Sequence, residues 1–305
     1  MHEVKTPKSK LMSAPLRVYW SLRPEDSGGV SSDAAVGFAR ELAELRVFFV
    51  TLGLSGGLRE DISGIVGELK KGGVRVIVSA DSEESLPDCG MLAAVDAIDI
   101  RAGGTDTCVV IKAALGCDKP LSLSVVPERG TADSMADAVR MAVEAGILTI
   151  NLVNPDIIDD PNVGRFVLDA GERAAIKAAL ESVLSGYGGS VKVMVHDLFL
   201  HRELCLPGLG DRIEYAGCQA ADAIAYIDSS GTIYPCASMQ ELLGHISTGL
   251  KVAWKSDARR SVRERILSDP AGCAGCAELS SCMGGCRGLA FATGGQDAKD
   301  PNCGK

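Results

Sequence analysis

Short apolar runs alternate with amphipathic segments along the first two hundred residues, at intervals of roughly 25 to 30 residues. Several apolar runs are continuous, which is typical of parallel strands that are covered on both faces. The amphipathic segments begin at capping residues or end at glycines, as helices do. The pattern predicts strands at 17–22, 47–52, 74–79, 95–100, 121–126, 147–153 and 191–195, and helices at 32–45, 61–71, 134–145 and 170–184.

Six or seven such βα units predict an α/β fold with a partial TIM-like barrel of the (β/α)6 type rather than a closed eightfold barrel. The rhythm stops near His201, where Gly, Cys and short hairpin-like runs take over. We therefore expect two domains, a partial barrel over 1–200 and a small cysteine-rich module over 201–305. The module is expected to hold a β-hairpin around the turn at 229–231 and a helix over 250–267.

Charge and hydropathy narrow the functional classes. The chain has 31 basic and 40 acidic residues, a formal net charge of -9, so its overall field repels nucleic acid and anionic membranes. No apolar run has the length of a signal peptide or a membrane span, which predicts a cytoplasmic protein with neither nucleic acid nor membrane as partner. The segment 250–267 is rich in arginine and lysine, which predicts either a solvated helix face or a docking patch for an acidic partner.

The eleven cysteines are unevenly distributed, because none precedes Cys89 and seven fall in the last 88 residues. Thiols stay reduced in the cytoplasm, so such a set favours metal binding over disulfides. Seven thiolates exceed one tetrahedral site and imply two metal centres. Zinc stays open on this chemistry, whereas the odd count and the C-x2-C-x5-C-x3-C spacing favour iron–sulfur clusters. The candidate ligands are Cys218, Cys236, Cys273, Cys276, Cys282, Cys286 and Cys303, with Cys205 as the nearby spare thiol.

Other residues with chemical potential are isolated. His196 and His201 flank the apolar run LFL near Cys205, and either is a minor candidate for a missing cluster ligand. No catalytic dyad is evident. The cysteines of the barrel half are expected to be buried thiols, since free cysteine behaves as a small hydrophobe; these are Cys89, Cys108 and Cys117.

The cysteine spacing, together with the segments IYPC, LGHI and CMGGC and the glycine of C-x12-G-x4-C, resembles the SPASM domain. This module follows the catalytic barrel in many radical SAM enzymes and holds two auxiliary [4Fe-4S] clusters. The resemblance implies that the ligands of the two clusters interleave along the chain. The implied ligands are Cys218, Cys236 and Cys286 for the first cluster, completed by Cys205 or left open, and Cys273, Cys276, Cys282 and Cys303 for the second.

The first two hundred residues resemble the radical SAM barrel in its scaffold alone. VYWSL resembles the first strand, after which the family carries C-x3-C-x2-C for the cluster that cleaves S-adenosylmethionine, but here RPEDSGGVSSD follows, without cysteine. The family's GGEP is reduced to Gly56 and Gly57 in LSGGLREDI. We therefore expect a degenerate barrel that cannot cleave S-adenosylmethionine by itself, and we do not expect that molecule as a cofactor.

The resemblance implies an accessory iron–sulfur protein that transfers electrons or presents a substrate in peptide modification. It is similar to the SPASM companion proteins of peptide-modification systems such as the GeoRSP type. The partners expected from this are a radical SAM enzyme and a peptide substrate or peptide chaperone. Two alternatives stay open: a stand-alone enzyme that uses an open iron of the first auxiliary cluster, and a zinc-stabilised scaffold that binds a peptide.

Overall fold

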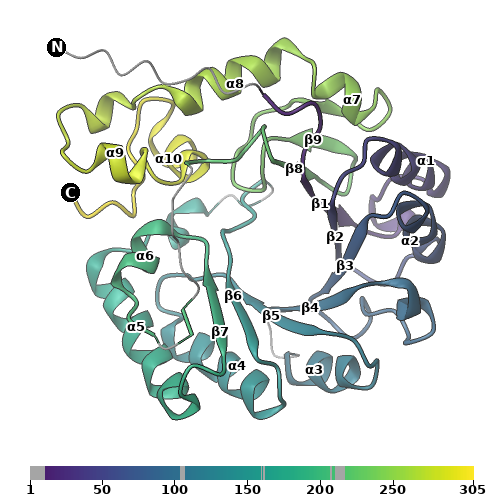
Figure 1. The fold of residues 1–305 in the computed structure, drawn as a ribbon, viewed down its shortest axis with the longest axis horizontal. Coiled ribbons are helices and arrows are strands. Elements are labelled where there is room, and N and C mark those ends of the chain that lie inside the picture. The colour runs from purple at the N-terminus through teal and green to yellow at the C-terminus, as the bar shows by residue number, and fades with distance from the viewer. Residues whose placement is uncertain (1–10, 104–106, 159, 161, 207, 210–216) are drawn as a thin grey trace.

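The computed structural model describes residues 11–103, 107–158, 160, 162–206, 208–209 and 217–305. In this part of the chain ten strands form one curled sheet in the order β10-β9-β8-β1-β2-β3-β4-β5-β6-β7, with helices on its outer side (Figure 1). The strands from β1 to β7 run parallel, as predicted. They are β1 (Arg17–Leu22), β2 (Phe49–Leu54), β3 (Arg75–Ala80), β4 (Ala97–Ala102), β5 (Leu121–Val125), β6 (Thr149–Leu152) and β7 (Lys192–Val195).

The outer helices follow from capping residues and apolar faces. Ser31 caps the first helix by accepting the Ala34 N–H, and Asp169 caps the fifth by accepting the Glu172 N–H. The predicted helices are present, whereas the third and sixth were not predicted. The helices are α1 (Ser32–Glu44), α2 (Ile62–Lys71), α3 (Thr107–Leu115), α4 (Ala132–Glu144), α5 (Ala170–Leu184) and α6 (Leu198–Glu203), and the short 3-10 turns are Glu25–Ser27, Met91–Ala94, Val163–Phe166 and Ser185–Tyr187.

Alternation along the strands separates a core from an inner cavity. In β1 the buried residues Val18, Trp20 and Leu22 face the outer helices, where Trp20 meets Phe38 of α1 edge-on with 5.1 Å between ring centroids. The intervening residues are only partly buried and face the inside of the curl. The interior is therefore a surface that can hold a ligand, and the apolar core lies between the sheet and the helices.

The C-terminal module extends the same sheet. Strand β8 (Ile224–Ile227) pairs in parallel with β1, and the predicted hairpin joins it to β9 (Thr232–Tyr234), beside which lies β10 (Gly244–His245). Gly231 in the turn has φ +90, and a Cβ there would lie 2.8 Å from Ile246 Cγ1, so only glycine fits. The sheet thus runs across residue 200, while the domain boundary at 200/201 stays a prediction.

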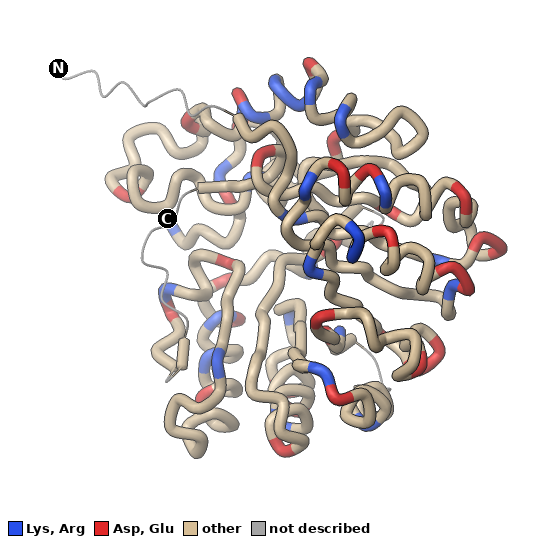
Figure 2. Tube along the Cα trace, turned by 45° about the vertical axis from the view of Figure 1, so that its right-hand side comes forward, with Lys and Arg blue, Asp and Glu red and all other residues tan. Residues whose placement is uncertain are grey.

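The predicted helix over 250–267 is two helices, α7 (Leu250–Ala253) and α8 (Asp257–Leu267), because Ser256 starts the second by capping the Arg259 N–H. Basic residues follow α8 along one edge of the molecule (Figure 2). Arg259 and Arg263 are nevertheless 4 % exposed each, so neither a solvated face nor a docking patch describes them. The module ends in a 3-10 turn (Ala271–Cys273), α9 (Leu279–Cys282) and α10 (Arg287–Gly294). No helix among the described residues has the length and apolarity needed to cross a bilayer.

Candidate functional site

Three cysteines of the module come together between the hairpin and α10. Cys218 lies just before β8, Cys236 just after β9, and Cys286 caps the N-terminus of α10. Burial raises the pKa of all three thiols, and for Cys286 the charge of Asp300 adds to it. Cys218 further raises the pKa of Cys236, and both raise that of Cys286. The structure therefore groups the three cysteines that the resemblance assigns to the first cluster, which we call the first cysteine group.

Backbone N–H groups face the sulfurs of this group. Burial raises the pKa of Cys218, but hydrogen bonds from the N–H groups of Ala220 and Arg287 act in the opposite direction. The Leu289 N–H donates to Cys286 Sγ at 3.4 Å. Such donors stabilise thiolate over thiol, and thiolate is the form that binds metal. Thiols that lie close together and have raised pKa values lose their protons together only when a positive charge such as iron binds them. The three cysteines and the N–H groups that face them therefore fit an iron–sulfur cluster.

The second cysteine group lies in the turns after α8. Cys273 ends the 3-10 turn, Cys282 ends α9, Cys276 lies between them and Cys303 comes from the C-terminal tail. The pKa of Cys273 is raised first by burial and then by the charges of Cys282, Cys303 and Cys276. Three of the cysteines that the resemblance assigns to the second cluster therefore act on the fourth, Cys273. Their role as ligands stays a prediction.

A single bound ion is a different requirement from a cluster. Within the described residues, no three His, Cys, Asp or Glu side chains converge in the way that one metal ion needs. In a four-iron cluster the cysteines bind different irons, so their sulfurs are spread around the cluster instead of around one point.

The fourth ligand of the first cluster is not fixed by these contacts. Cys205 follows α6, and its side chain is exposed. On the barrel side, Asn154 Nδ2 lies 3.9 Å from Cys286 Sγ, and His196 and Cys236 line the same cavity. The first cysteine group thus borders the interior of the barrel. Cys205 as its fourth ligand stays a prediction.

The barrel cysteines differ from the expectation of buried thiols. Cys89 is exposed and forms a disulfide with Cys117, with 4.9 Å between the Cα atoms. The turn before the second 3-10 segment and the end of α3 bring the two together, although 28 residues separate them. Cys108 is half-buried and free.

His201, the second histidine considered as a missing cluster ligand, lies half-buried within α6.

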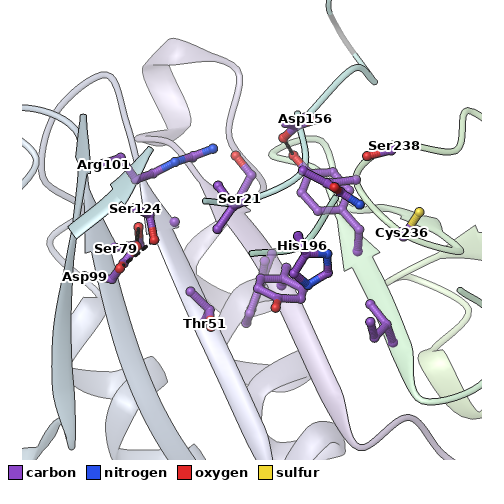
Figure 3. A pocket seen from close by; sticks show the side chains of 18 residues that line it. Ser21, Thr51, Ser79, Asp99, Arg101, Ser124, Asp156, His196, Cys236 and Ser238 are labelled. Atoms are coloured by element: carbon purple, nitrogen blue, oxygen red, sulfur yellow. Dashed lines mark hydrogen bonds between the residues drawn. The ribbon is translucent and has the colours of Figure 1, made fainter. Parts of the chain in front are cut away.

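A cavity of about 170 Å³ occupies the interior of the curled sheet, toward the carboxyl ends of its strands (Figure 3). Successive strands contribute inward-pointing polar side chains to it, and Cys236 forms its border with the first cysteine group. Ligands bind at this end of parallel sheets. The polar lining includes Ser21, Thr51, Asp99, Arg101, Asp156 and His196.

Asp99 on β4 is the most deeply placed carboxylate of the cavity. Its Oδ2 accepts from Ser79 Oγ at 2.9 Å, and its Oδ1 accepts from Ser122 at 2.6 Å and from Ser124 at 2.7 Å. The side chain is 9 % exposed, and burial raises its pKa despite the three hydroxyl donors. The neutral acid is therefore favoured over the range in which an ordinary aspartate ionises.

Arg101 supplies the positive charge of the cavity. Among the described residues its guanidinium has no hydrogen-bond or ion-pair partner, and Figure 3 shows it pointing across the cavity toward Ser21. Nearby, the Tyr226 hydroxyl donates to Asp156, and burial together with that carboxylate raises the pKa of Tyr226. A guanidinium without a partner in a partly enclosed site is suited to a carboxylate or another anionic group.

An arginine closes the loop after β1, where the resemblance places C-x3-C-x2-C. Arg59 is 3 % exposed, and its guanidinium donates to the carbonyls of Arg23 at 2.7 Å and Val30 at 2.9 Å. The same group pairs with Asp61 at 2.6 Å. The Gly56–Gly57 pair before it has positive φ at both residues, which lets the chain turn from β2 toward this loop. The loop is built around a guanidinium, which no motif in the sequence indicates.

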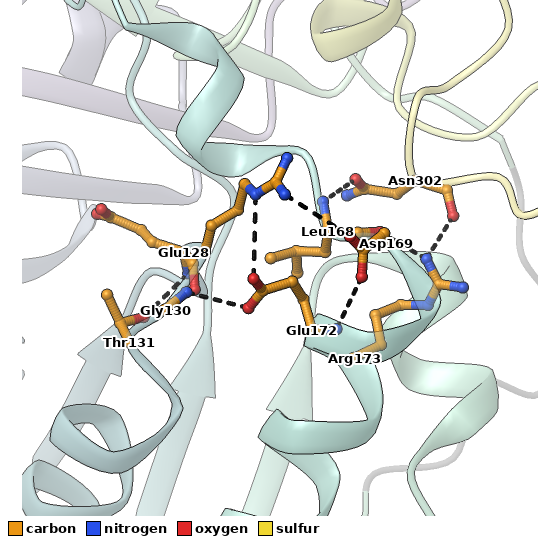
Figure 4. A network of polar contacts seen from close by, with 9 residues as sticks. Glu128, Gly130, Thr131, Leu168, Asp169, Glu172, Arg173 and Asn302 are labelled. Carbon is orange, nitrogen blue, oxygen red and sulfur yellow. Dashed lines mark hydrogen bonds and ion pairs between the residues drawn. The ribbon is translucent and has the colours of Figure 1, made fainter.

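The tail that carries Cys303 is bound to the barrel by α5 (Figure 4). Arg173, which is 4 % exposed, donates to the carbonyls of Leu168 at 2.6 Å and Asn302 at 2.9 Å. The Asn302 side chain accepts in turn from the Leu168 N–H at 2.7 Å. The second cysteine group is therefore anchored to the barrel, far away in sequence.

Asp300 links this tail to the first cysteine group. Its carboxylate accepts from the Cys286 N–H at 2.5 Å and the Asn302 N–H at 2.9 Å, and burial raises the pKa of Asp300 to about 7. Gly285 has φ +67, and a Cβ there would overlap the Asp300 carboxylate, which explains the second glycine of CMGGC.

The sequence carries one signal for Asp99 of the cavity, which was not among the candidate residues. Asp99 is a charged residue inside the apolar run VDAIDI.

Comparison with known proteins bears on the fold and on the C-terminal module. Residues 218–277 match SPASM, an iron–sulfur cluster-binding domain. No curated protein matches the chain. Among solved structures, Streptococcus suis SuiB bound to precursor peptide SuiA is similar with a TM-score of 0.69 and 14% identity, over 95% of this chain and 76% of SuiB. Native anSMEcpe with bound AdoMet and Cp18Cys peptide is similar with a TM-score of 0.63 and 13% identity, over 94% of each chain.

At these identities the structural likeness concerns the fold. The expected resemblance is confirmed in two respects, the SPASM match of the C-terminal module and the α/β barrel architecture. The chain therefore carries a SPASM iron–sulfur cluster-binding domain on a scaffold with the fold of radical SAM/SPASM enzymes.

Proposed function

We propose that this protein is an accessory iron–sulfur protein that carries two auxiliary [4Fe-4S] clusters and acts beside a radical SAM enzyme in peptide modification. The observation that carries the proposal is the separation of the module's cysteines into two groups, each coupled through its own charges. The interleaving of the two groups along the chain matches the ligand order that the SPASM resemblance implies. When bound, such clusters supply one-electron redox chemistry.

The ligands are assigned in two sets. Cys273, Cys276, Cys282 and Cys303 provide the four thiolates of the second cluster. Cys218, Cys236 and Cys286 hold the first, and either Cys205 or an open position completes it. The thiols of each set become thiolates together when they bind iron. In the first set, backbone N–H donors from α10 stabilise the thiolates.

The barrel takes no part in making radicals. The segment that precedes Cys89 contains no cysteine, and three thiolates are required to hold a cluster with one open iron. Arg59 and its partners form the loop in which those thiolates would lie. We expect anaerobically loaded protein, given S-adenosylmethionine and a reductant, to release no 5'-deoxyadenosine. Turnover by the isolated chain would contradict this.

The cavity gives the barrel a role in holding the peptide. Cys236 borders it, and Arg101, which has no partner among the residues that the structure describes, offers its cation to an acidic side chain or a terminal carboxylate. Two proteins of the same fold have a peptide bound in their solved structures. A peptide residue bound in this cavity lies beside the first cysteine group. The cavity would then present the peptide at the place where the first cluster can exchange electrons with it.

Metal analysis tests the core of the proposal. Anaerobically purified or reconstituted protein is expected to be brown, with about eight iron and eight sulfide per chain and the EPR signals of two reduced four-iron clusters. The tagged, loaded chain is further expected to retain a radical SAM enzyme from the source cell in a pull-down. Colourless protein with stoichiometric zinc would favour a zinc-stabilised peptide scaffold instead.

A second function is favoured by one observation. Because Cys236 lines the cavity and Asn154 lies 3.9 Å from the Cys286 sulfur, an open iron of the first cluster would face the barrel interior and act there as a Lewis acid or redox centre. Replacement of Cys205 by serine separates the two functions. Full iron content and an added small ligand that changes the EPR spectrum would favour the enzyme, whereas loss of iron from one cluster would identify Cys205 as the fourth ligand.

A further inference from the structure

Two buried arginines carry a polar group that no described residue satisfies. In the part of the chain that the structure describes, four buried side-chain nitrogens have no hydrogen-bond partner: the indole nitrogens of Trp20 and Trp254, and Nε of Arg263 and of Arg287. Both arginines are nearly inaccessible, at 4 % and 6 % exposed. A buried donor without a partner destabilises the folded state, so the repeated unpaired Nε of a buried arginine points to a missing acceptor.

Arg263 on α8 faces the first cysteine group. Its Nη1 donates to the carbonyls of Cys218 at 2.7 Å and Ala220 at 2.9 Å, and its Nη2 lies 4.0 Å from Asp222. These contacts fix the guanidinium against the backbone of the first cysteine and leave Nε free. Its charge lowers the pKa of Cys218, against the larger effect of burial.

Arg287, the first residue of α10, directly follows Cys286 of the first cysteine group. Its Nη1 donates to the Ala298 carbonyl at 3.1 Å and its Nη2 to the Gln296 carbonyl at 2.9 Å, which again leaves Nε free. Its charge acts on Cys218 of the first group and on Cys273 of the second, lowering both pKa values against burial. Arg263 acts on the first group, whereas Arg287 reaches both.

The sulfur atoms of an iron–sulfur cluster can accept the hydrogen bonds that the Nε–H groups of Arg263 and Arg287 do not make within the described residues. A [4Fe-4S] cluster with thiolate ligands presents electron-rich sulfur atoms, and its potential depends on net charge and on hydrogen bonds to those sulfurs. Reduction adds a negative charge, which a buried cation and an N–H donor stabilise more than they stabilise the oxidised state. A guanidinium at this place therefore raises the reduction potential.

On the basis of the proposed function, we propose that Arg263 and Arg287 set the reduction potentials of the two clusters, with their free Nε–H groups directed at cluster sulfur. Arg263 raises the potential of the first cluster alone. Arg287 raises the potentials of both. Both residues act on the clusters alone, because they contact neither substrate nor the reacting atoms of a partner.

Redox titration of the loaded full-length chain, followed by EPR, tests this pattern. The variants are Arg263→Gln and Arg287→Gln, with Arg260→Gln as matched control, because Arg260 lies on the exposed face of α8 and bonds to Asp257 and the Lys255 carbonyl. Loss of Cys236 in a separate Cys236→Ser variant identifies which signal belongs to the first cluster.

We expect Arg263→Gln to make reduction of the first cluster about tenfold less favourable, a shift of about 59 mV to lower potential for a one-electron couple. Arg287→Gln is expected to shift both potentials downward by a comparable amount, and Arg260→Gln to shift neither. Equal potentials in wild type and both test variants would overturn the inference, as would an Arg287→Gln shift confined to one cluster.

Iron and sulfide content separate this inference from the function on which it rests. A wild-type chain that loads no cluster overturns the proposed function and the inference together, whereas normal loading with unshifted potentials overturns the inference alone. Should the glutamine variants fail to load, Arg263→Lys and Arg287→Lys carry the test, since lysine keeps the charge but lacks Nε–H. Smaller downward shifts with the same pattern support the inference, and wild-type potentials contradict it.

Discussion

A carboxylate can stay inside the barrel at Asp99 because three serine hydroxyls surround it. The hydrogen bonds from Ser79, Ser122 and Ser124 satisfy both oxygens, but they do not offset the loss of water, and burial raises the pKa of Asp99. The folded state then keeps a proton at pH values where the unfolded chain has lost it. The contribution of Asp99 to stability is therefore complete below its unfolded pKa near 3.8 and is lost as the pH rises toward the folded value.

Asp99→Asn should remove this dependence. Urea unfolding from about pH 4 to about pH 7 should show a smaller decline of the unfolding free energy with pH in the variant than in wild type, because asparagine does not ionise. The matched control is Asp133→Asn, which changes an exposed aspartate at the start of α4. Equal slopes in wild type and Asp99→Asn would show that Asp99 ionises normally.

Arg59 supports the loop after β1 through contacts to residues more than twenty positions away. Replacement by alanine leaves the Arg23 and Val30 carbonyls without their donor and Asp61 without its partner. We expect Arg59→Ala to lower the unfolding free energy by about 3–5 kcal/mol in urea denaturation. Arg40→Ala, which breaks an exposed pair with Glu68, should cost less than about 1 kcal/mol. Similar losses in the two variants would contradict a structural role for Arg59.

Spacing identifies some of these residues and not others. The cysteines and Gly231 stand out because cluster ligands and a tight hairpin require particular residue types at short intervals. Arg59 and Asp99 do not stand out in this way, because their partners are on other strands and loops. Polar networks of that kind become visible only once the topology is known.

At the scale of elements, hydrophobic patterning predicts what each segment buries but not which segment it meets. The parallel strands from β1 to β7 follow from continuous apolar runs, although β2 begins at Phe49 instead of residue 47. The pairing of β8 with β1 could not be predicted, because about 200 residues separate them and either strand would suit any parallel neighbour. Arg259 and Arg263 of α8 were not expected to be buried, because a charged residue that bonds to buried carbonyls has the same sequence pattern as a solvated one.

The disulfide between Cys89 and Cys117 ties the second 3-10 turn to the end of α3. The two cysteines are 28 residues apart in the sequence. A disulfide that closes a loop of this length lowers the conformational entropy of the unfolded chain, which stabilises the folded state by about 3–4 kcal/mol. We expect Cys89→Ser, at an exposed position, to lower the unfolding free energy by up to that amount in oxidised protein and by little under reducing conditions. Cys108→Ser is the control, since Cys108 is free. Equal stability of Cys89→Ser and oxidised wild type, or a wild-type mass without the loss of two hydrogens, would refute the bridge.

For the whole molecule, the sheet joins parts that the sequence pattern separates. Strand β8 of the cysteine-rich module is hydrogen-bonded to β1 over Arg17 to Trp20, and Arg173 of the barrel holds Asn302 of the tail. Contacts of this kind couple the unfolding of the two parts. The composition change near residue 200 therefore marks a change of chemistry, and a calorimetric experiment decides whether it also marks a change of folding unit.

Removal of iron should lower the melting temperature of the barrel as well as that of the module. Metal binding stabilises the folded state over the unfolded one, and because β8 and the tail belong to the same packed structure as β1 and α5, that free energy is shared by the whole chain. Calorimetry under anaerobic conditions is expected to show one transition for loaded protein and one, at lower temperature, after chelation. The barrel disulfide stays oxidised in both samples. Two transitions, with the upper one insensitive to iron, would mean that residues 1–200 fold independently of the cluster-binding module.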